Sequence, residues 1–139
     1  MILAIEIIEH IENPQQFLRE CNSLLINGGY LILTTPNVCD FNSKRKWLFE
    51  SEFYHFSPEA IHYTGHISIL PYWLLEYFLI SANFNIQKGY AWGKVGRAFY
   101  KDIILNSFYY FLGLLISKHR KFLTGDNIII TAMKNRLKI

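Results

Sequence analysis

The sequence predicts an α/β fold in which helices flank a sheet that begins with a parallel strand pair, and three observations support this. A helical pattern gives way at Asn27-Gly28-Gly29 to a short apolar run, Tyr30–Thr35, and Pro36 ends that run because proline cannot donate to a sheet ladder. The run is apolar on both faces, as in strands buried in a parallel sheet. An earlier apolar run, Met1–Ile8, precedes the helix, so strand, helix and strand form a βαβ unit that we expect to be right-handed.

The helix of this unit has clear end signals. Asn13 is a suitable N-cap and Pro14 stands at the first helical position, where a missing N–H costs nothing. Apolar side chains recur at helical spacing on one face as far as about Leu25. Gly28 can adopt the left-handed conformation that a helix C-terminus favours. The sequence therefore predicts a helix over residues 14–25.

Residues 38–70 form an irregular segment rich in aromatic residues and histidines. A connection this long is uncommon unless it acts as a lid or a binding segment. It follows the C-terminal end of a strand, which is where open α/β sheets bind their ligands. We expect a lid or acceptor loop here; a surface excursion held by its own aromatic residues is the alternative.

The rest of the chain continues the α/β pattern. Pro71 begins a second helix that runs to about Ala82, and Asn83 is its expected C-cap. Phe84–Tyr90 is the expected third strand, and Asn127–Met133, after a Gly-Asp turn, is the fourth. A short basic tail follows from residue 134.

Residues 97–121 are a hydrophobic helical insertion before the last strand. Their most apolar part, Ile103–Ile116, has 14 residues, fewer than the roughly 20 that span a bilayer. Basic residues flank both ends of the insertion. The pattern fits a lid or dimer helix packed on protein, and it also fits an interfacial helix in contact with a membrane surface.

Composition narrows the classes of function. The chain has 139 residues, enough for one domain or part of one, and its net charge of +3 is scattered rather than gathered on one face, so we expect no nucleic-acid partner. The two cysteines show no metal or disulfide pattern. Met1–Ile8 lacks the basic start of a signal peptide, so we expect a cytoplasmic protein. The hydrophobic residues 97–121 leave open that this protein also contacts a membrane surface.

The run from Glu6 to Asn37 resembles one family. Glu-Ile-Ile-Glu-His-Ile-Glu-Asn-Pro, the helix after it, and Asn-Gly-Gly-Tyr-Leu-Ile-Leu-Thr-Thr-Pro-Asn are similar to class I S-adenosylmethionine-dependent methyltransferases, in the branch of the ubiquinone-biosynthesis O-methyltransferases. Asn27 stands where that family usually has proline. The helix begun by Pro71 and the strand pair ending near Lys134 also fit. The resemblance covers nearly the whole chain, but its specific part is residues 1–37.

The resemblance implies a partial Rossmann-like fold, strands 4 to 7 of the seven-stranded methyltransferase sheet with flanking helices. The family binds S-adenosylmethionine through a Gly-rich loop and an acidic residue in the first half of its domain, and this sequence contains neither. We therefore expect the chain to be the C-terminal part of a single domain. It divides into a βαβ core (1–37), the acceptor loop (38–70), a helix and strand (71–96), the insertion (97–121) and the last strand and tail (122–139).

The resemblance also implies roles for particular residues. Glu6, Glu9 and His10 resemble a divalent-metal site near the acceptor, for which carboxylates suit Mg²⁺. Glu9 and His10 would lie beside the cofactor, and His10 and His66 are the candidate catalytic residues. Pro36, Asn37 and His66 are candidate substrate contacts. On the residues alone, Glu9 and His10 can equally be turn residues, Glu6 a partly buried strand residue, and Pro36 a plain strand stop.

The function implied is methyl transfer from S-adenosylmethionine to a small-molecule or lipid-linked acceptor, by a chain that lacks the cofactor-binding half. The first strand would leave an apolar edge, so we expect either a complementing N-terminal half or a homo-oligomer. The alternative is a catalytically inactive remnant or a docking partner of a full methyltransferase. Either could also contact a membrane surface.

Overall fold

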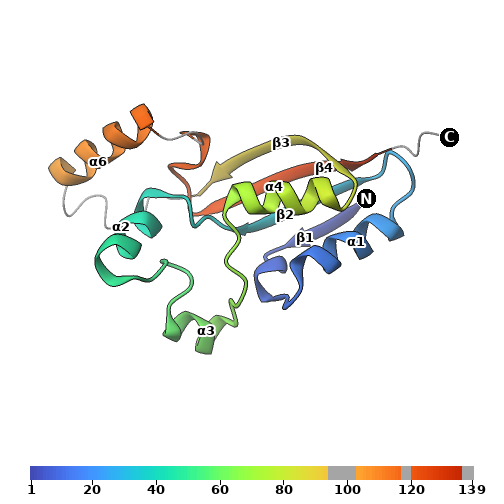
Figure 1. Ribbon diagram of the computed structural model, residues 1–139, viewed down its shortest axis with the longest axis horizontal. Coiled ribbons are helices and arrows are strands. Elements are labelled where there is room, and N and C mark those ends of the chain that lie inside the picture. The colour runs from blue at the N-terminus through green and yellow to red at the C-terminus, as the bar shows by residue number, and fades with distance from the viewer. Residues whose placement is uncertain (94–102, 117–119, 136–139) are drawn as a thin grey trace.

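The computed structural model describes residues 1–93, 103–116 and 120–135, which build a four-stranded mixed sheet with helices (Figure 1). The strands are β1 (Ile2–Ile5), β2 (Tyr30–Pro36), β3 (Phe84–Trp92) and β4 (Asn127–Lys134), and their order across the sheet is β1-β2-β4-β3. β1 and β2 are parallel, whereas β4 is antiparallel to both of its neighbours. The predicted α/β fold and its parallel βαβ start are confirmed, and the sheet is mixed, because only the β1–β2 pair is parallel.

Two helices pack on one face of this sheet, α1 (Pro14–Leu24) and α4 (Tyr72–Ser81) (Figure 1). α1 begins as predicted, because the Asn13 side chain accepts a hydrogen bond from the Gln16 backbone N–H at 3.0 Å. α4 begins after its N-cap residue Pro71, and its C-cap residue is Ala82. Asn83, the predicted C-cap, lies one residue further on, with a left-handed φ of 65°.

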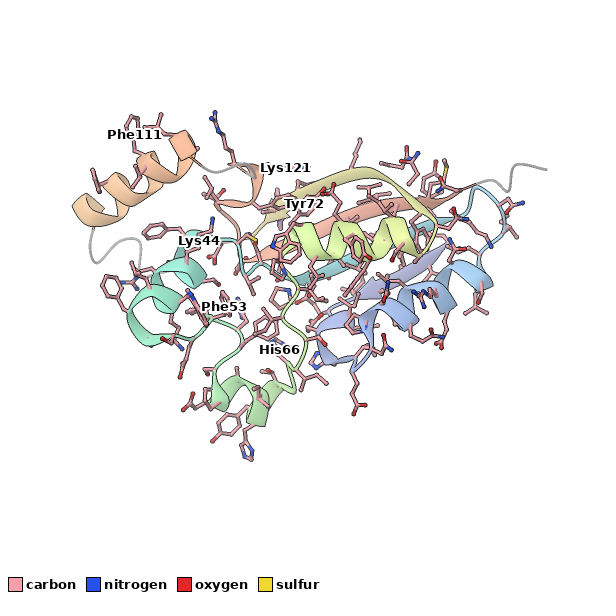
Figure 2. All side chains as sticks on the ribbon, viewed as in Figure 1. Lys44, Phe53, His66, Tyr72, Phe111 and Lys121 are labelled. Carbon is pink, nitrogen blue, oxygen red and sulfur yellow. The ribbon has the colours of Figure 1, made fainter. Side chains whose placement is uncertain are left out.

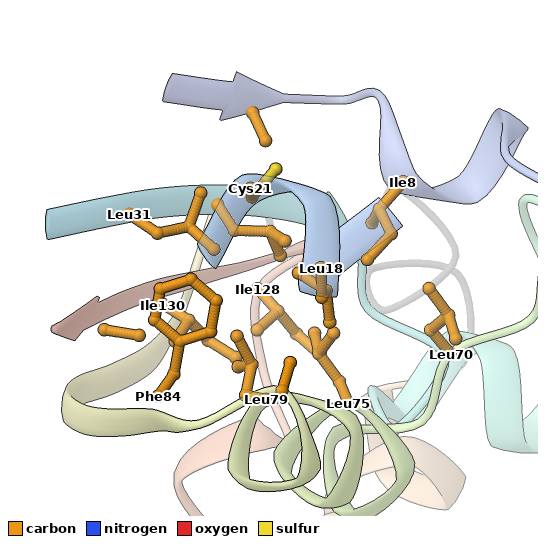
Figure 3. Packing of buried hydrophobic residues seen from close by; sticks show 14 of the residues in the cluster. Ile8, Leu18, Cys21, Leu31, Leu70, Leu75, Leu79, Phe84, Ile128 and Ile130 are labelled. Carbon is orange, nitrogen blue, oxygen red and sulfur yellow. The ribbon is translucent and has the colours of Figure 1, made fainter. Parts of the chain in front are cut away.

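The core lies between these helices and the sheet (Figure 3). Every second residue of the central strands points into it, as the two-residue repeat of a strand requires. Fully buried examples are Leu31 and Leu33 of β2 and Ile128 and Ile130 of β4. The helices and loops contribute further buried side chains: Ile8, Leu18, Cys21, Leu70, Leu75, Leu79 and Phe122.

The opposite face of the sheet is open in part. Leu3 and Ile5 of β1 are 55% and 48% exposed, and Tyr30 of β2 is 44% exposed. Leu3 pairs with Ile32, and Ile32 in turn with Thr131, so these residues lie in rows across one face. α1 and α4, the described helices that pack on the sheet, lie on the other side.

The first strand is shorter than the predicted Met1–Ile8. It ends at Ile5 because Glu6 adopts a left-handed φ of 50° and turns the chain. Ile8–His10 then form a 3-10 helix, η1. The expectation that Glu6 is a partly buried residue within the strand is therefore wrong, since Glu6 is exposed and follows the strand.

Residues 38–70 are less irregular than predicted, because they contain α2 (Phe41–Glu50) and α3 (Pro58–Thr64). Each helix has a side-chain N-cap. Asp40 accepts from the backbone N–H groups of Ser43 and Asn42, and Ser57 accepts from that of Ala60. The segment connects β2 to α4 at the C-terminal end of β2.

The hydrophobic insertion contains α6 (Ile103–Ile116), which matches the predicted apolar run; residues 97–102 and 117–119 of the insertion lie outside the described part. α6 approaches the body near Gly113, where an added Cβ would lie 3.5 Å from the Leu123 side chain. No helix in the described ranges has the length and apolar content to cross a membrane. The last strand, β4, confirms the prediction, while tail residues 136–139 are outside the described chain.

Candidate functional site

Glu9, His10 and His66 come together beside the C-terminal end of β1. η1 places Glu9 and His10 directly after that strand, and His66 follows α3. Each residue can offer a ligand atom, and these atoms lie within 4.8 Å of one another. The two imidazole rings meet edge to face with centroids 4.8 Å apart. Figure 2 shows His66 on the link that rises from α3 toward α4.

Backbone hydrogen bonds hold the two segments in register. The Glu9 carbonyl oxygen accepts from the backbone N–H groups of Ile67 and Ser68, both at 2.9 Å. The Ser68 hydroxyl donates to the Ile11 carbonyl at 2.6 Å. The segment after α3 is thus attached to η1 on both sides of His10, and the position of His66 is determined by the backbone.

The hydrogen bonds of the two histidines determine their tautomers. His10 Nδ1 lies 3.1 Å from the Gly65 carbonyl oxygen, and His66 Nδ1 lies 3.0 Å from that of His55. A carbonyl oxygen only accepts, so both Nδ1 atoms carry the proton. In its neutral form each ring therefore keeps an unprotonated Nε2, which can bind a metal ion or take up a proton.

The Glu9 carboxylate is fully buried and only half satisfied. Its Oε2 accepts from the Thr35 hydroxyl at 3.1 Å, but its Oε1 has no hydrogen-bond partner. His10 Nε2 lies 3.9 Å from Oε1, which is too long for a hydrogen bond. Burial, above all, raises the pKa of the Glu9 carboxyl above its usual value.

Glu6 does not join this group. Its Oε1 accepts from the Thr34 hydroxyl at 2.6 Å, and its backbone N–H donates to the same hydroxyl oxygen at 3.0 Å. The left-handed turn at Glu6 directs the chain away from the extended path that would continue β1. The structure thus brings Glu9 and His10 together with His66, and Glu6 stays with β2.

The fold resembles those of solved methyltransferase structures. The chain superposes on a SAM-dependent methyltransferase from Archaeoglobus fulgidus with a TM-score of 0.60 and 14% identity, over 95% of this chain and 57% of that one. For a SAM-dependent methyltransferase from Thermotoga maritima the TM-score is 0.57 at 16% identity, over 96% and 54%. The chain has the fold of the S-adenosylmethionine-dependent methyltransferases.

Sequence comparison supports the same resemblance over a shorter stretch. A ubiquinone biosynthesis O-methyltransferase from Caulobacter is 43% identical over 37 residues, which are 27% of this chain and 15% of that protein. No protein-family profile matches the chain. The chain spans between about half and two thirds of the length of the structures it resembles.

The methyltransferase fold also carries other chemistry. The [4+2]-cyclase SpnF matches the chain with a TM-score of 0.51 and 15% identity, over 96% of this chain and 48% of that one. Reaction type is therefore argued from the site and not from the fold.

Pro36 and Asn37 stand where β2 of this methyltransferase fold ends. Both are buried. Asn37 Nδ2 donates to the carbonyl oxygens of Phe122 and Gly125, and its Oδ1 accepts from the backbone N–H of Cys39. The Asn37 side chain therefore joins β2 to the segment before β4, and substrate contact at these two residues stays a prediction.

Sequence analysis missed Thr35 and considered His55 only as a weaker candidate than His66. Thr35 holds the Glu9 carboxylate, and His55 supplies the carbonyl that orients His66. Burial lowers the pKa of the His55 side chain. Thr35 could have been noticed, because a polar residue on the buried face of an apolar strand requires a hydrogen-bond partner.

Proposed function

We propose that this chain is the C-terminal, acceptor-side part of a methyltransferase domain that transfers the methyl group of S-adenosylmethionine to a small-molecule or lipid-linked acceptor. The observation that carries the proposal is a methyltransferase-like sheet that the described helices cover on one face, with β1 as its outer strand. By resemblance, β1, β2, β3 and β4 correspond to strands 4, 5, 6 and 7 of the seven-stranded sheet.

Cofactor binding is assigned to residues outside 1–139, on the same polypeptide or on another. The Gly-rich loop and the acidic residue that the family uses for S-adenosylmethionine have no counterpart in this sequence. The exposed apolar side chains of β1, Leu3 and Ile5, mark the surface on which such a half would pack. A strand of that half paired alongside β1 would also satisfy the unpaired backbone groups at this edge of the sheet.

The chemistry assigned to the site is alignment and proton removal. In methyl transfer the sulfonium S–CH₃ bond breaks while a bond forms between the methyl carbon and an oxygen, nitrogen or carbon of the acceptor. The acceptor gives up a proton, which the unprotonated Nε2 of His10 or His66 can take. The segment 38–70, built as α2 and α3, would cover the acceptor.

A docking role is the second candidate, and the same outer strand favours it. A chain with this surface could pack on a full methyltransferase or on another copy of itself. One solved neighbour, a methyltransferase matched with a TM-score of 0.51 and 11% identity, is in complex with the Haloferax volcanii Trm112 activator. Membrane-surface contact through 97–121 stays part of this candidate, since Phe108 and Phe111 are each 61% exposed.

Calorimetry with S-adenosylmethionine tests the first proposal in two steps. The chain 1–139 alone should show no binding at micromolar concentrations of cofactor. The DNA upstream of the Met1 codon should then be read, and a protein extended by any in-frame Gly-rich unit should bind the cofactor and transfer labelled methyl groups. Micromolar binding by 1–139 alone would contradict the division of the domain. An extended protein without affinity for the cofactor would contradict the methyltransferase function.

A further inference from the structure

Acidic residues gather at one edge of the sheet, where three of its strands end or begin. Glu6 directly follows β1, Asp40 comes shortly after β2, and Asp126 directly precedes β4. The strand register brings the ends of β1 and β2 and the start of β4 to the same edge, toward which β1, β2 and β3 all point (Figure 1). Glu9, in η1, lies beside the end of β1. We call Glu6, Glu9, Asp40 and Asp126 the acidic edge.

Histidines are the groups that oppose the negative charge of this acidic edge. Burial, above all, raises the pKa of the Glu9 and Asp40 carboxyls, and the nearby cation that lowers it is His10 for Glu9 and His55 for Asp40. Burial lowers the pKa of the His55 side chain, which the charges of Asp40 and Asp126 oppose. Among the described residues, no lysine or arginine acts on Glu9, Asp40 or His55. This edge is therefore negative, although the chain as a whole has a net charge of +3.

Unpartnered oxygen atoms are the independent sign of a ligand here. Glu9 Oε1, Asn42 Oδ1 and Asp126 Oδ1 are buried and have no hydrogen-bond partner, and neither has His55 Nε2. Glu9 and Asn42 are only 0% and 9% exposed. The three oxygens can only accept hydrogen bonds, and a buried acceptor without a donor is unfavourable. A ligand that donates hydrogen bonds and carries positive charge would satisfy them.

Aromatic rings adjoin the acidic edge. Phe56 is buried, and its ring centroid lies 5.5 Å from that of His66. Tyr54 meets His55 edge to face, with centroids 4.9 Å apart. Such rings offer apolar contact, and their faces attract cations. They suit a ligand whose charged group is attached to an apolar or aromatic body.

We propose that the acidic edge binds the ammonium group of an organic amine, so that the acceptor of the proposed methyl transfer is an amine. The assignment of this amine as the acceptor rests on the proposed function, whereas its binding does not. An ammonium group combines positive charge with several N–H donors, as these oxygens require. An alcohol or phenol offers one O–H donor and no charge.

Methyl transfer to this ligand needs one prior proton transfer. The ammonium gives a proton to the unprotonated Nε2 of His10 or His66, which frees the nitrogen lone pair. The lone pair then forms the bond to the methyl carbon while the S–CH₃ bond breaks, and its electrons stay on sulfur, which leaves as a neutral thioether. The acidic edge stabilises the positive charge that the methylated nitrogen carries.

Calorimetric titration of chain 1–139 with phenethylamine and with phenethyl alcohol tests the site, with EDTA present so that metal ions take no part. The amine should bind at least about tenfold more tightly than the alcohol, because a charge-assisted hydrogen bond is lost with the alcohol. Added salt should weaken only the binding of the amine.

Two nearly isosteric variants locate the binding. Asp126→Asn should weaken amine binding by about tenfold to hundredfold, because it removes a charged acceptor. Asp40→Asn keeps an N-cap for α2 but removes a charge, and should weaken it by up to about tenfold. Glu20→Gln removes an exposed carboxylate of α1 and is the control, which should bind the amine like the wild type. Circular dichroism checks the folding of each variant, and should one be unfolded, the other decides.

Three results would overturn amine binding at this edge. They are a wild-type chain that binds the amine no better than the alcohol, folded Asp126→Asn and Asp40→Asn variants that both bind like the wild type, and a Glu20→Gln variant that loses as much affinity as they do.

The role of the amine as acceptor is tested on the extended protein. Labelled methyl groups should appear on the amine and not on the alcohol. Transfer to the alcohol alone, or displacement of the amine by S-adenosylmethionine, would overturn this assignment and leave the methyltransferase function standing. An extended protein without affinity for S-adenosylmethionine would contradict the proposed function, while amine binding by chain 1–139 would still be measured.

Discussion

The two faces of the sheet both carry apolar side chains, but the helices in the described part of the chain cover only one of them. Under α1 and α4, Leu33 and Ile130 are 0% exposed, whereas Leu3 and Ile5 on the other face are 55% and 48% exposed. Removal of apolar surface from water stabilises by roughly 25 cal/mol per Å². The closed face therefore stabilises this fold, and the open face is available for a second layer. The difference shows that an apolar pattern on both faces of a sheet does not by itself tell which face is buried.

The largest contrast is expected between matched leucines on the two faces. Leu33→Ala should destabilise the chain by about 2–5 kcal/mol, because it leaves a cavity in a closed core. Leu3→Ala should change stability by less than about 0.5 kcal/mol, as for other exposed positions. Urea unfolding followed by circular dichroism measures both. Equal losses would mean that the open face is covered in solution.

A substitution of Asn37 tests how much its buried side-chain hydrogen bonds stabilise the end of β2. Asn37→Ala should cost about 2–3 kcal/mol, because it leaves the buried carbonyls of Phe122 and Gly125 and the N–H of Cys39 without their partner. Asn85→Ala, at an exposed position of β3, is the control and should be nearly neutral. A neutral Asn37→Ala would show that water replaces these hydrogen bonds.

A smaller effect is expected at the start of α1, which covers the closed face. Asn13→Ala removes the hydrogen bond to the Gln16 N–H and should cost about 1 kcal/mol. Asn13→Ser, which keeps a capping oxygen, should restore most of the loss. Thermal unfolding of the three proteins side by side measures this. If the serine variant is no better than alanine, the cap contributes little.

The smallest effect on stability, but a clear one on association, is expected on the open face. Ile5→Lys places a charge in the exposed apolar row and should shift any self-association toward monomer while leaving the unfolding midpoint nearly unchanged. Gln87→Lys adds the same charge at an exposed position of β3 and should leave association unaltered. Sedimentation velocity at several concentrations compares the two. An Ile5→Lys variant that associates like the wild type would exclude this face as the contact.

Sequence reasoning succeeded where the signals are local and failed where they are not. Asn13 and Pro14 predict the start of α1 correctly, because capping acts within one helical turn. α2 was missed although Asp40 caps it, because the adjacent Trp47, Leu48 and Phe49 are all exposed and show no helical period. An exposed helix with consecutive apolar residues resembles a loop when only periodicity is considered.

The candidate site was foreseen in its members but not in its assembly. Glu9, His10 and His66 were each named from the sequence, and the first two are neighbours in it. That the cluster contains His66 and not Glu6 depends on one left-handed residue and on hydrogen bonds between η1 and the segment after α3. Periodicity and capping rules contain no information on contacts of this range.

The sequence by itself determined the βαβ start, the helices α1 and α4, the strands after them, and the resemblance to methyltransferases, because caps, glycine turns and apolar periods act over a few residues. Only the tertiary structure decided that the Glu6 carboxylate bonds to Thr34, that the Asn37 side chain makes internal hydrogen bonds, and that Leu3 and Ile5 remain exposed among the described residues. Those outcomes depend on partners tens of residues apart, whose meeting is decided by the packing of the whole chain.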